Sequence, residues 1–299
     1  MKYIYKLYFL LARLISSKMG WGLFSYQHHR IRSESDDGRY TSSVKKAVYS
    51  ERAFSKFKRD YNYSVILEHV SVKHAERYVE ILKERNDGFL ERALDTLMVD
   101  DNLGSPRKVP VSGLKGNFST TSIRYLKVAS DINLLFGPDF LSTAEIGCGY
   151  GGQCIFNDSL LNVESAYLFD LPIVNKLISR YINYFLLRGS FHVAHINNTL
   201  PRPYDLVISN YAFSELPRDL QLSYMSKILA HSKKGYLTMN SGIGGVRDEG
   251  KLSLDEILSF LPDDAAVLEE DPNTYNFNYL LVWGYDSDTL NKNFTVKTV

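Results

Sequence analysis

The sequence is short of cysteine, of net charge and of long apolar runs, and each shortage excludes a class of protein. Its two cysteines, Cys148 and Cys154, provide no disulfide framework, so we expect a reducing, cytoplasmic compartment. The 35 basic and 34 acidic residues leave a formal net charge of +1, which argues against a dedicated nucleic-acid-binding protein. With 299 residues the chain is long enough for one large domain or two small ones.

The first 24 residues are rich in apolar side chains but contain no run long enough to cross a bilayer. Lys6 and Arg13 interrupt a run that would need about 20 apolar residues, and no small-residue cleavage site indicates a secretory signal. On a helix, Lys2 would share one stripe with Lys6 and Arg13. Residues 1–17 are therefore predicted to form an amphipathic helix, which packs against the protein or a partner copy, or contacts the inner surface of a membrane.

From about residue 140 onward, short apolar runs alternate with helical patterns. Apolar side chains recur at helical spacing over residues 173–186, with Pro172 suited to the first turn, and a second helix is expected over residues 220–229. The runs predict strands at residues 142–148, 166–170, 191–196, 205–210 and 236–240. This alternation predicts parallel strands joined by crossover helices, which is a doubly wound α/β sheet.

The end of the chain breaks this alternation. After a helix expected at residues 254–261, two strand-like runs at 265–269 and 279–283 are joined by a short loop, so they should pair antiparallel. An antiparallel hairpin at the end of a parallel sheet is not the usual ending of a dinucleotide-binding domain.

The first part of the chain shows helical periodicity without alternating strands. Segments rich in Ser, Asp, Gly and Pro at residues 33–43 and 100–116 are expected to be loops. We therefore predict a helical cap that contacts substrate over residues 1–118 and a second domain over residues 119–299, which begins with a helix at 119–137.

The stretch AEIGCGYGGQC, at residues 144–154, has glycines with the spacing G-x-G-x-x-G. Such glycines let the backbone of a strand-to-helix turn approach a ligand, and the spacing alone fits a dinucleotide as well as S-adenosylmethionine. Glu145 would repel a pyrophosphate but could accept hydrogen bonds from the ammonium of a cationic ligand. It therefore favours S-adenosylmethionine, which carries an ammonium and a sulfonium.

Asp170 lies at the end of the next predicted strand, 18 residues after Gly152. A carboxylate there can accept the ribose hydroxyls of either nucleoside-containing ligand, so it indicates a nucleoside without distinguishing the two. The alternative role of Asp170 is to cap the helix that begins near Pro172.

Three motifs in order resemble the class I S-adenosylmethionine-dependent methyltransferases, and within them the bacterial sugar O-methyltransferases. The motifs are EIGCGYGG from residue 145, DLP from residue 170 and YDLVISNYAFSEL from residue 204, and FSTTSIRYLKVASDI before them resembles the family's lead-in helix. The likeness covers residues 117–285. It implies a Rossmann-like, seven-stranded, mostly parallel sheet with an antiparallel last strand. It also implies methyl transfer from S-adenosylmethionine to a sugar hydroxyl in glycan biosynthesis, with S-adenosylhomocysteine as product.

Ligands of such sheets lie beyond the carboxyl ends of the strands, which places the expected site residues. The candidate general base is Glu215, because the segment after the fourth strand would face the methyl group; its alternative role is to complement a helix dipole. The acceptor is expected to contact Tyr211, Ser214 and Arg247, the last in a glycine-rich loop suited to a lid. The donor is expected to contact Glu145, Gly147, Cys148, Gly149, Gly151, Asp170, Leu171, Asn197, Asn210 and Tyr211.

Other functions remain open at this point. The enzyme could methylate a phenolic or amine metabolite, it could be an NAD-dependent oxidoreductase, or the chain could be a catalytically silent subunit that binds the cofactor. No cluster of His, Cys and acidic residues has the spacing of a metal site, so we expect a metal-independent enzyme. The sequence specifies neither the acceptor sugar nor the oligomeric state.

Overall fold

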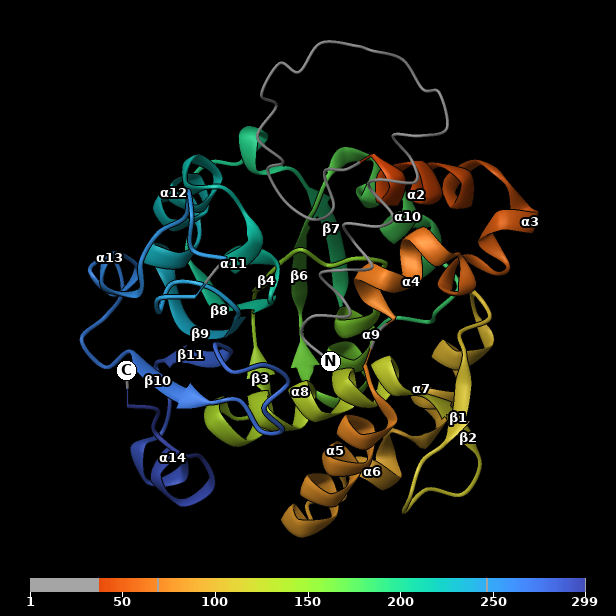
Figure 1. The fold of residues 1–299 in the computed structure, drawn as a ribbon, viewed down its shortest axis with the longest axis horizontal. Coiled ribbons are helices and arrows are strands. Elements are labelled where there is room, and N and C mark those ends of the chain that lie inside the picture. The colour runs from red at the N-terminus through yellow and green to blue at the C-terminus, as the bar shows by residue number, and fades with distance from the viewer. Residues whose placement is uncertain (1–37, 69, 246, 299) are drawn as a thin grey trace. The chain divides into compact units, whose positions relative to one another are not determined.

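The computed structural model describes residues 38–68, 70–245 and 247–298 (Figure 1). The predicted amphipathic helix at residues 1–17 lies outside the described residues. Within the described residues, no helix combines the length and the apolar character that crossing a membrane requires.

A seven-stranded sheet forms the centre of the described fold, with strand order β10-β11-β9-β8-β4-β6-β7 (Figure 1). Strand β11 runs antiparallel to both of its neighbours, and the other strands run parallel to one another. The strands are β4 (Thr143–Ile146), β6 (Ser165–Phe169), β7 (Ser190–Ala194), β8 (Tyr204–Asn210), β9 (Ser232–Met239), β10 (Ala266–Glu269) and β11 (Tyr279–Trp283). This arrangement confirms the predicted mostly parallel sheet with an antiparallel last strand.

The continuous apolar runs of the strands are explained by burial on both faces of the sheet. Successive side chains of a strand point to opposite faces, and the strands of this sheet other than β4 contribute to both hydrophobic clusters. In β4, Ala144 and Ile146 belong to the second cluster. Glu145 pairs in register with Leu168 and Ile208, which belong to the first cluster. A carboxyl group therefore lies among apolar side chains in the centre of the sheet.

Helices cover both faces of the sheet. The first face packs against α8 (Thr120–Phe136), α9 (Gly152–Leu160), α10 (Pro172–Ile182) and α14 (Ser287–Asn293). The second face packs against α11 (Ala212–Glu215), α12 (Arg218–Lys227) and α13 (Leu254–Leu258). The four helices predicted in this part of the chain are confirmed, although α10 and α13 end several residues earlier than predicted.

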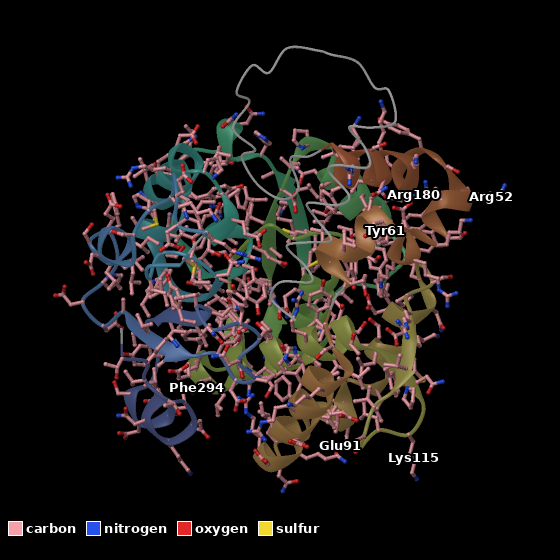
Figure 2. The ribbon with its side chains drawn as sticks, viewed as in Figure 1. Arg52, Tyr61, Glu91, Lys115, Arg180 and Phe294 are labelled. Carbon is pink, nitrogen blue, oxygen red and sulfur yellow. The ribbon has the colours of Figure 1, made fainter. Side chains whose placement is uncertain are left out.

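Helices before residue 103 pack beside this sheet domain. They are α2 (Arg39–Tyr49), α3 (Glu51–Phe54), η2 (Phe57–Arg59), α4 (Tyr61–Leu67), α5 (Val72–Arg85), α6 (Phe89–Arg92) and α7 (Leu94–Asn102). Arg180 of α10 joins them to the sheet domain, because its guanidinium donates hydrogen bonds to Ala47 O and Val48 O of α2 (Figure 2). A single hydrophobic cluster contains residues from both sides of position 118, and the domain boundary at that position stays a prediction.

Both predicted loops are wrong in part. Residues 39–43 of the loop predicted at 33–43 form the first turn of α2, and the loop predicted at 100–116 contains the end of α7 and a strand. Strand β1 (Lys108–Pro110) pairs antiparallel with β2 (Asn117–Ser119). Strands of three residues are too short to show an alternating pattern, so the sequence does not reveal them. Two further short strands, β3 (Asp139–Phe140) and β5 (Asn162–Val163), pair parallel outside the main sheet.

Candidate active site

The glycine loop connects β4 to α9 at the carboxyl edge of the sheet. Gly147, Gly149 and Gly151 have φ angles of 75°, 59° and 91°, in the left-handed region that favours glycine. The Gly147 amide donates a 2.8 Å hydrogen bond to Phe169 O of β6. A Cβ atom built on Gly147 would lie 2.0 Å from Cβ of Ala212, so α11 leaves no room for a side chain here. Residues other than glycine at these positions would therefore disturb the backbone conformation of the loop.

Asp170 fixes this loop from the end of β6. Its Oδ2 accepts a 2.9 Å hydrogen bond from the Gly149 amide, and its Oδ1 accepts one of 2.7 Å from the Leu171 amide. Burial raises the pKa of the Asp170 carboxyl to about 6, although these backbone donors act in the opposite direction. Because a carboxylate oxygen can accept more than one hydrogen bond, both oxygens retain capacity for a ligand hydroxyl.

Glu145 is 4% exposed, and its Oε2 has no hydrogen-bond partner among the described residues. Burial, and secondarily the nearby Asp170 carboxylate, raise the pKa of Glu145 to about 8. The side chain therefore holds a proton at neutral pH. A positive charge placed beside it would favour the ionised form and supply the missing partner.

Asn210 and Tyr211 lie at the end of β8, next to β4. Asn210 Oδ1 is buried without a partner among the described residues, while its Nδ2 donates to Gln153 Oε1 at 3.4 Å. Tyr211 has a φ of 67°, a conformation that costs a non-glycine residue about 1–3 kcal/mol and is concentrated at functional sites. Its hydroxyl donates to the Glu270 carboxylate. Two unpartnered oxygens and one strained residue thus lie at the ends of neighbouring strands.

The residues after Tyr211 are joined by hydrogen bonds to the residue that follows β9, Asn240. Ser214 is fully buried, and its Oγ lies 2.7 Å from Tyr211 O and 2.8 Å from Asn240 Oδ1. Glu215 Oε1 accepts a 2.9 Å hydrogen bond from Asn240 Nδ2 and lies 3.9 Å from a guanidinium nitrogen of Arg247. The structure therefore brings Glu215 and Arg247 together, and it places the Ser214 hydroxyl inside the turn.

The remaining predicted donor contacts have different surroundings. The Cys148 thiol is buried and donates to Glu145 O at 3.2 Å, so it points into the core. Leu171 is partly buried and follows Asp170 directly. Asn197 is exposed in a 3-10 turn after β7, which is the edge strand of the sheet and lies two strands away from β4. The functional roles of these residues stay predictions.

A cavity of about 300 Å³ lies between α5, α8 and the strands β9 and β11, and its lining includes Asn210 and Tyr211. Its volume suits a small-molecule site. Glu215, Ser214 and Arg247 do not line it. The lining residues that the sequence did not single out include Tyr78, Arg124, Lys127, Thr238 and Glu270.

One signal in the sequence pointed to Arg124. The predicted helix at 119–137 carries this charge between the apolar Ile123 and the aromatic Tyr125, inside a segment that resembles the family's lead-in helix. No comparable signal marks Glu270, which reaches the site through the hairpin loop between β10 and β11.

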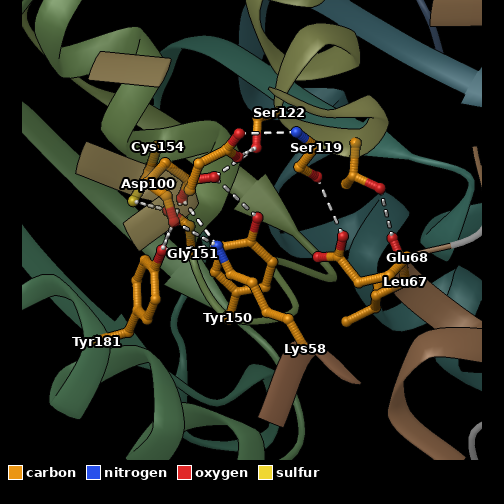
Figure 3. Close-up of polar contacts among 12 residues, drawn as sticks. Lys58, Leu67, Glu68, Asp100, Ser119, Ser122, Tyr150, Gly151, Cys154 and Tyr181 are labelled. Carbon is orange, nitrogen blue, oxygen red and sulfur yellow. Dashed lines mark hydrogen bonds and ion pairs between the residues drawn. The ribbon is translucent and has the colours of Figure 1, made fainter. Parts of the chain in front are cut away.

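A buried polar network supports the glycine loop from the side of the N-terminal helices (Figure 3). Lys58 Nζ lies 3.2 Å from Asp100 Oδ1, donates to Tyr181 OH at 2.8 Å, and lies 4.2 Å from the ring centre of Tyr150. Asp100 also accepts hydrogen bonds from Tyr181 OH and Ser122 Oγ, each at 2.6 Å. Tyr150 belongs to the glycine loop, so this satisfied ion pair helps to fix the loop's position.

The described residues contain no group of three or more His, Cys, Asp or Glu side chains that could hold a metal ion. The expected independence from metal stays a prediction.

Neither protein-family models nor curated proteins give a match to this chain. Among solved structures, the N-methyltransferase NodS from Bradyrhizobium japonicum WM9 with S-adenosylhomocysteine is 11% identical, with 54% of this chain and 85% of that chain covered and a TM-score of 0.40. Mitomycin 7-O-methyltransferase MmcR is 11% identical, with 55% and 56% covered and a TM-score of 0.39. The cyclopropane synthase MmaA2 from Mycobacterium tuberculosis is 12% identical, with 47% and 58% covered and a TM-score of 0.38. At this overlap the likeness establishes no activity, so the function has to rest on the site itself.

Proposed function

We propose that the protein is an S-adenosylmethionine-dependent O-methyltransferase that acts on a hydroxyl of a sugar or glycan precursor. The observation that carries the proposal is a pair of buried oxygens beside the glycine loop, Glu145 Oε2 and Asn210 Oδ1, which have no hydrogen-bond partner in the part of the chain that the structure describes. Unsatisfied buried acceptors are costly and are retained at functional sites. Both are acceptors, so they suit a ligand that brings hydrogen-bond donors and positive charge.

The other residues of the loop fit S-adenosylmethionine as well. Asp170 retains acceptor capacity for ribose hydroxyls, and Gly147 and Gly149 place no side chain at their two positions of the loop. Glu145 suits a cationic ligand better than a pyrophosphate, because a positive charge stabilises its ionised form and the negative charge of a pyrophosphate does not. The antiparallel strand β11 between β9 and β10 also differs from the usual dinucleotide-binding sheet. These features favour a methyl donor over NAD.

Methyl transfer depends mainly on the alignment of the acceptor oxygen, the methyl group and the sulfur. The sulfonium supplies an electrophilic methyl group, and in-line attack by the acceptor oxygen depends on positioning. Glu215 is proposed as the base that takes the hydroxyl proton, oriented by its hydrogen bond from Asn240. Glu215 does not line the cavity, so Glu270, which lines it and accepts a hydrogen bond from the Tyr211 hydroxyl, is the second candidate base for an acceptor bound there.

The sugar acceptor is supported by the three sequence motifs and by the size of the cavity. We further propose that the enzyme works in the cytoplasm, with residues 1–17 reaching the inner membrane surface, because their basic stripe suits anionic headgroups.

Transfer of a labelled methyl group to a panel of hexoses, phenols and amines tests the proposal. We expect product with hexoses, and a loss of about 100-fold or more in kcat for Glu215→Gln if it is the base. Glu91→Gln, on the exposed surface of α6, is the matched control and should leave kcat unchanged (Figure 2). Methylation of phenols or amines alone would contradict the sugar assignment. An unchanged kcat in Glu215→Gln would show that Glu215 is not the base and would leave Glu270 as the candidate.

A further inference from the structure

Arg124 of α8 is a buried cation that has no carboxylate partner within residues 38–68, 70–245 and 247–298. Its side chain is 8% exposed, Nε is buried without a hydrogen-bond partner, and no ion pair or hydrogen bond to the guanidinium exists among the described residues. The guanidinium carbon lies 5.5 Å from the ring centre of Tyr125 and 5.8 Å from that of Tyr211. These rings attract the charge, but they do not satisfy a guanidinium that has five donors.

The other cations that line the cavity are paired or exposed. Arg85 and Lys127 lie 2.6 and 2.7 Å from the two oxygens of Asp131, and Arg77 lies 3.1 Å from Asp271. Lys292 is exposed. Arg85 and Lys127 therefore share the single carboxylate of Asp131, whereas Arg77 contacts two carboxylates of the lining, Glu84 and Asp271. Arg124 differs from Arg77, Arg85 and Lys127 because it forms no ion pair with any described residue.

No carboxylate of the cavity forms an ion pair with Arg124, and each has other hydrogen-bond or ion-pair partners. Glu84 and Asp271 bind Arg77, and Glu269 binds Lys297 at 3.0 Å. Glu270 accepts hydrogen bonds from Tyr211 OH, from the backbone and hydroxyl of Thr274, and from Asn278. Glu68, beyond the cavity lining, acts on Arg124 through space without forming an ion pair.

We propose that Arg124 binds an anionic group, a phosphate or a carboxylate, on the methyl acceptor. This inference rests on the proposed methyltransferase function and assigns the class of its acceptor. A guanidinium presents a planar fork of donors that matches both oxyanions, and it is desolvated here, which strengthens the interaction. The site is separate from the donor loop, since no residue between Gly147 and Gly151 lines the cavity. Tyr78 and Tyr211 provide walls on which a sugar ring can pack.

The test compares three hexoses that share a ring and differ in charge: glucose, glucose 1-phosphate and glucuronate. Each is titrated by calorimetry into the full-length protein saturated with S-adenosylhomocysteine. We expect one or both charged hexoses to bind roughly tenfold or more tightly than glucose, as one charge-assisted pair predicts. The phosphate and the carboxylate arms identify which anion the site accepts.

Arg124→Met should reduce the affinity for the charged hexose to that for glucose, and Arg124→Lys should restore part of the difference. Arg52→Gln, on the exposed surface of α3, is the control and should retain it (Figure 2). Because Arg124→Met leaves no partner unpaired, it should unfold at the same temperature as the unaltered protein or higher. That combination, lost binding with retained stability, distinguishes a binding residue from a structural one.

Two results would overturn the inference. Equal affinities of the unaltered protein for all three hexoses would remove the anion requirement whatever the variants do. A loss of S-adenosylhomocysteine affinity in Arg124→Met, as large as the loss of hexose affinity, would assign Arg124 to the donor. Failure of the unaltered protein to bind S-adenosylhomocysteine at all would instead overturn the proposed function itself.

Discussion

Replacing Glu145 by glutamine should change the way in which stability depends on pH. The pKa of Glu145 is raised to about 8 in the folded protein, against an ordinary value of 4.5. Between these values the folded protein holds the proton and the unfolded chain releases it. The folded state therefore binds more protons, so the free energy of unfolding falls as pH rises from about 4.5 to 8.

The size of the effect follows from one proton. A difference of one bound proton changes the free energy of unfolding by about 1.4 kcal/mol per pH unit, so about 2–3 kcal/mol is lost between about pH 5.5 and 7.5. Glu145→Gln retains the shape of the side chain and removes its titration. Between about pH 5.5 and 7.5, the free energy of unfolding of Glu145→Gln relative to that of the unaltered protein should therefore rise by about 2–3 kcal/mol. The pKa values of Glu68, Asp101 and Asp170 are also raised, to about 7, 6 and 6, and these groups are present in both proteins.

Urea unfolding at several pH values measures this difference, and the buried Trp283 provides a fluorescence signal. Glu91→Gln, on the exposed surface, is the control and should follow the unaltered protein at every pH (Figure 2). If the stabilities of Glu145→Gln and the unaltered protein differ by a constant amount across this range, Glu145 does not hold a proton in the folded state, and the reasoning is wrong.

Three further substitutions test the loop and its support. In Gly147→Ala the new Cβ atom would overlap Cβ of Ala212, and the φ of 75° is strained for alanine, so the free energy of unfolding in urea should fall by about 2–4 kcal/mol. Adding Ala212→Gly should restore only the part of this loss that the overlap causes. A smaller loss in Gly147→Ala would contradict the close packing. Lys58→Met leaves the fully buried Asp100 without its cation and should cost about 3–5 kcal/mol by the same measurement, whereas a neutral result would show that the ion pair is absent. Asp170→Asn should weaken S-adenosylhomocysteine binding about tenfold or more in calorimetry, and unchanged affinity would remove Asp170 from the donor site.

Local patterns made the sheet and the glycine loop predictable. The strands read as continuous apolar runs because both faces are buried, and the short link after β10 required an antiparallel partner. Glu145 could be recognised because a charge in a buried strand departs from its neighbours. These features depend on residues close together in the sequence.

Contacts between distant segments could not be predicted in the same way. Lys58 and Asp100 are 42 residues apart, and each reads as a surface charge until the fold brings them together. The cavity is built from α5, α8, β9 and β11, and no local pattern signals its shape. Arg124 could be noticed as a charge among apolar neighbours, but only the structure shows that its Nε has no hydrogen-bond partner among the described residues.

The central claim is that the glycine loop holds S-adenosylmethionine, and calorimetric titration with S-adenosylhomocysteine and, separately, with NADH tests it most directly. We predict that S-adenosylhomocysteine binds to the unaltered protein, that Glu145→Gln weakens this binding, and that NADH gives no binding heat. Tight binding of NADH without a response to S-adenosylhomocysteine would contradict the account.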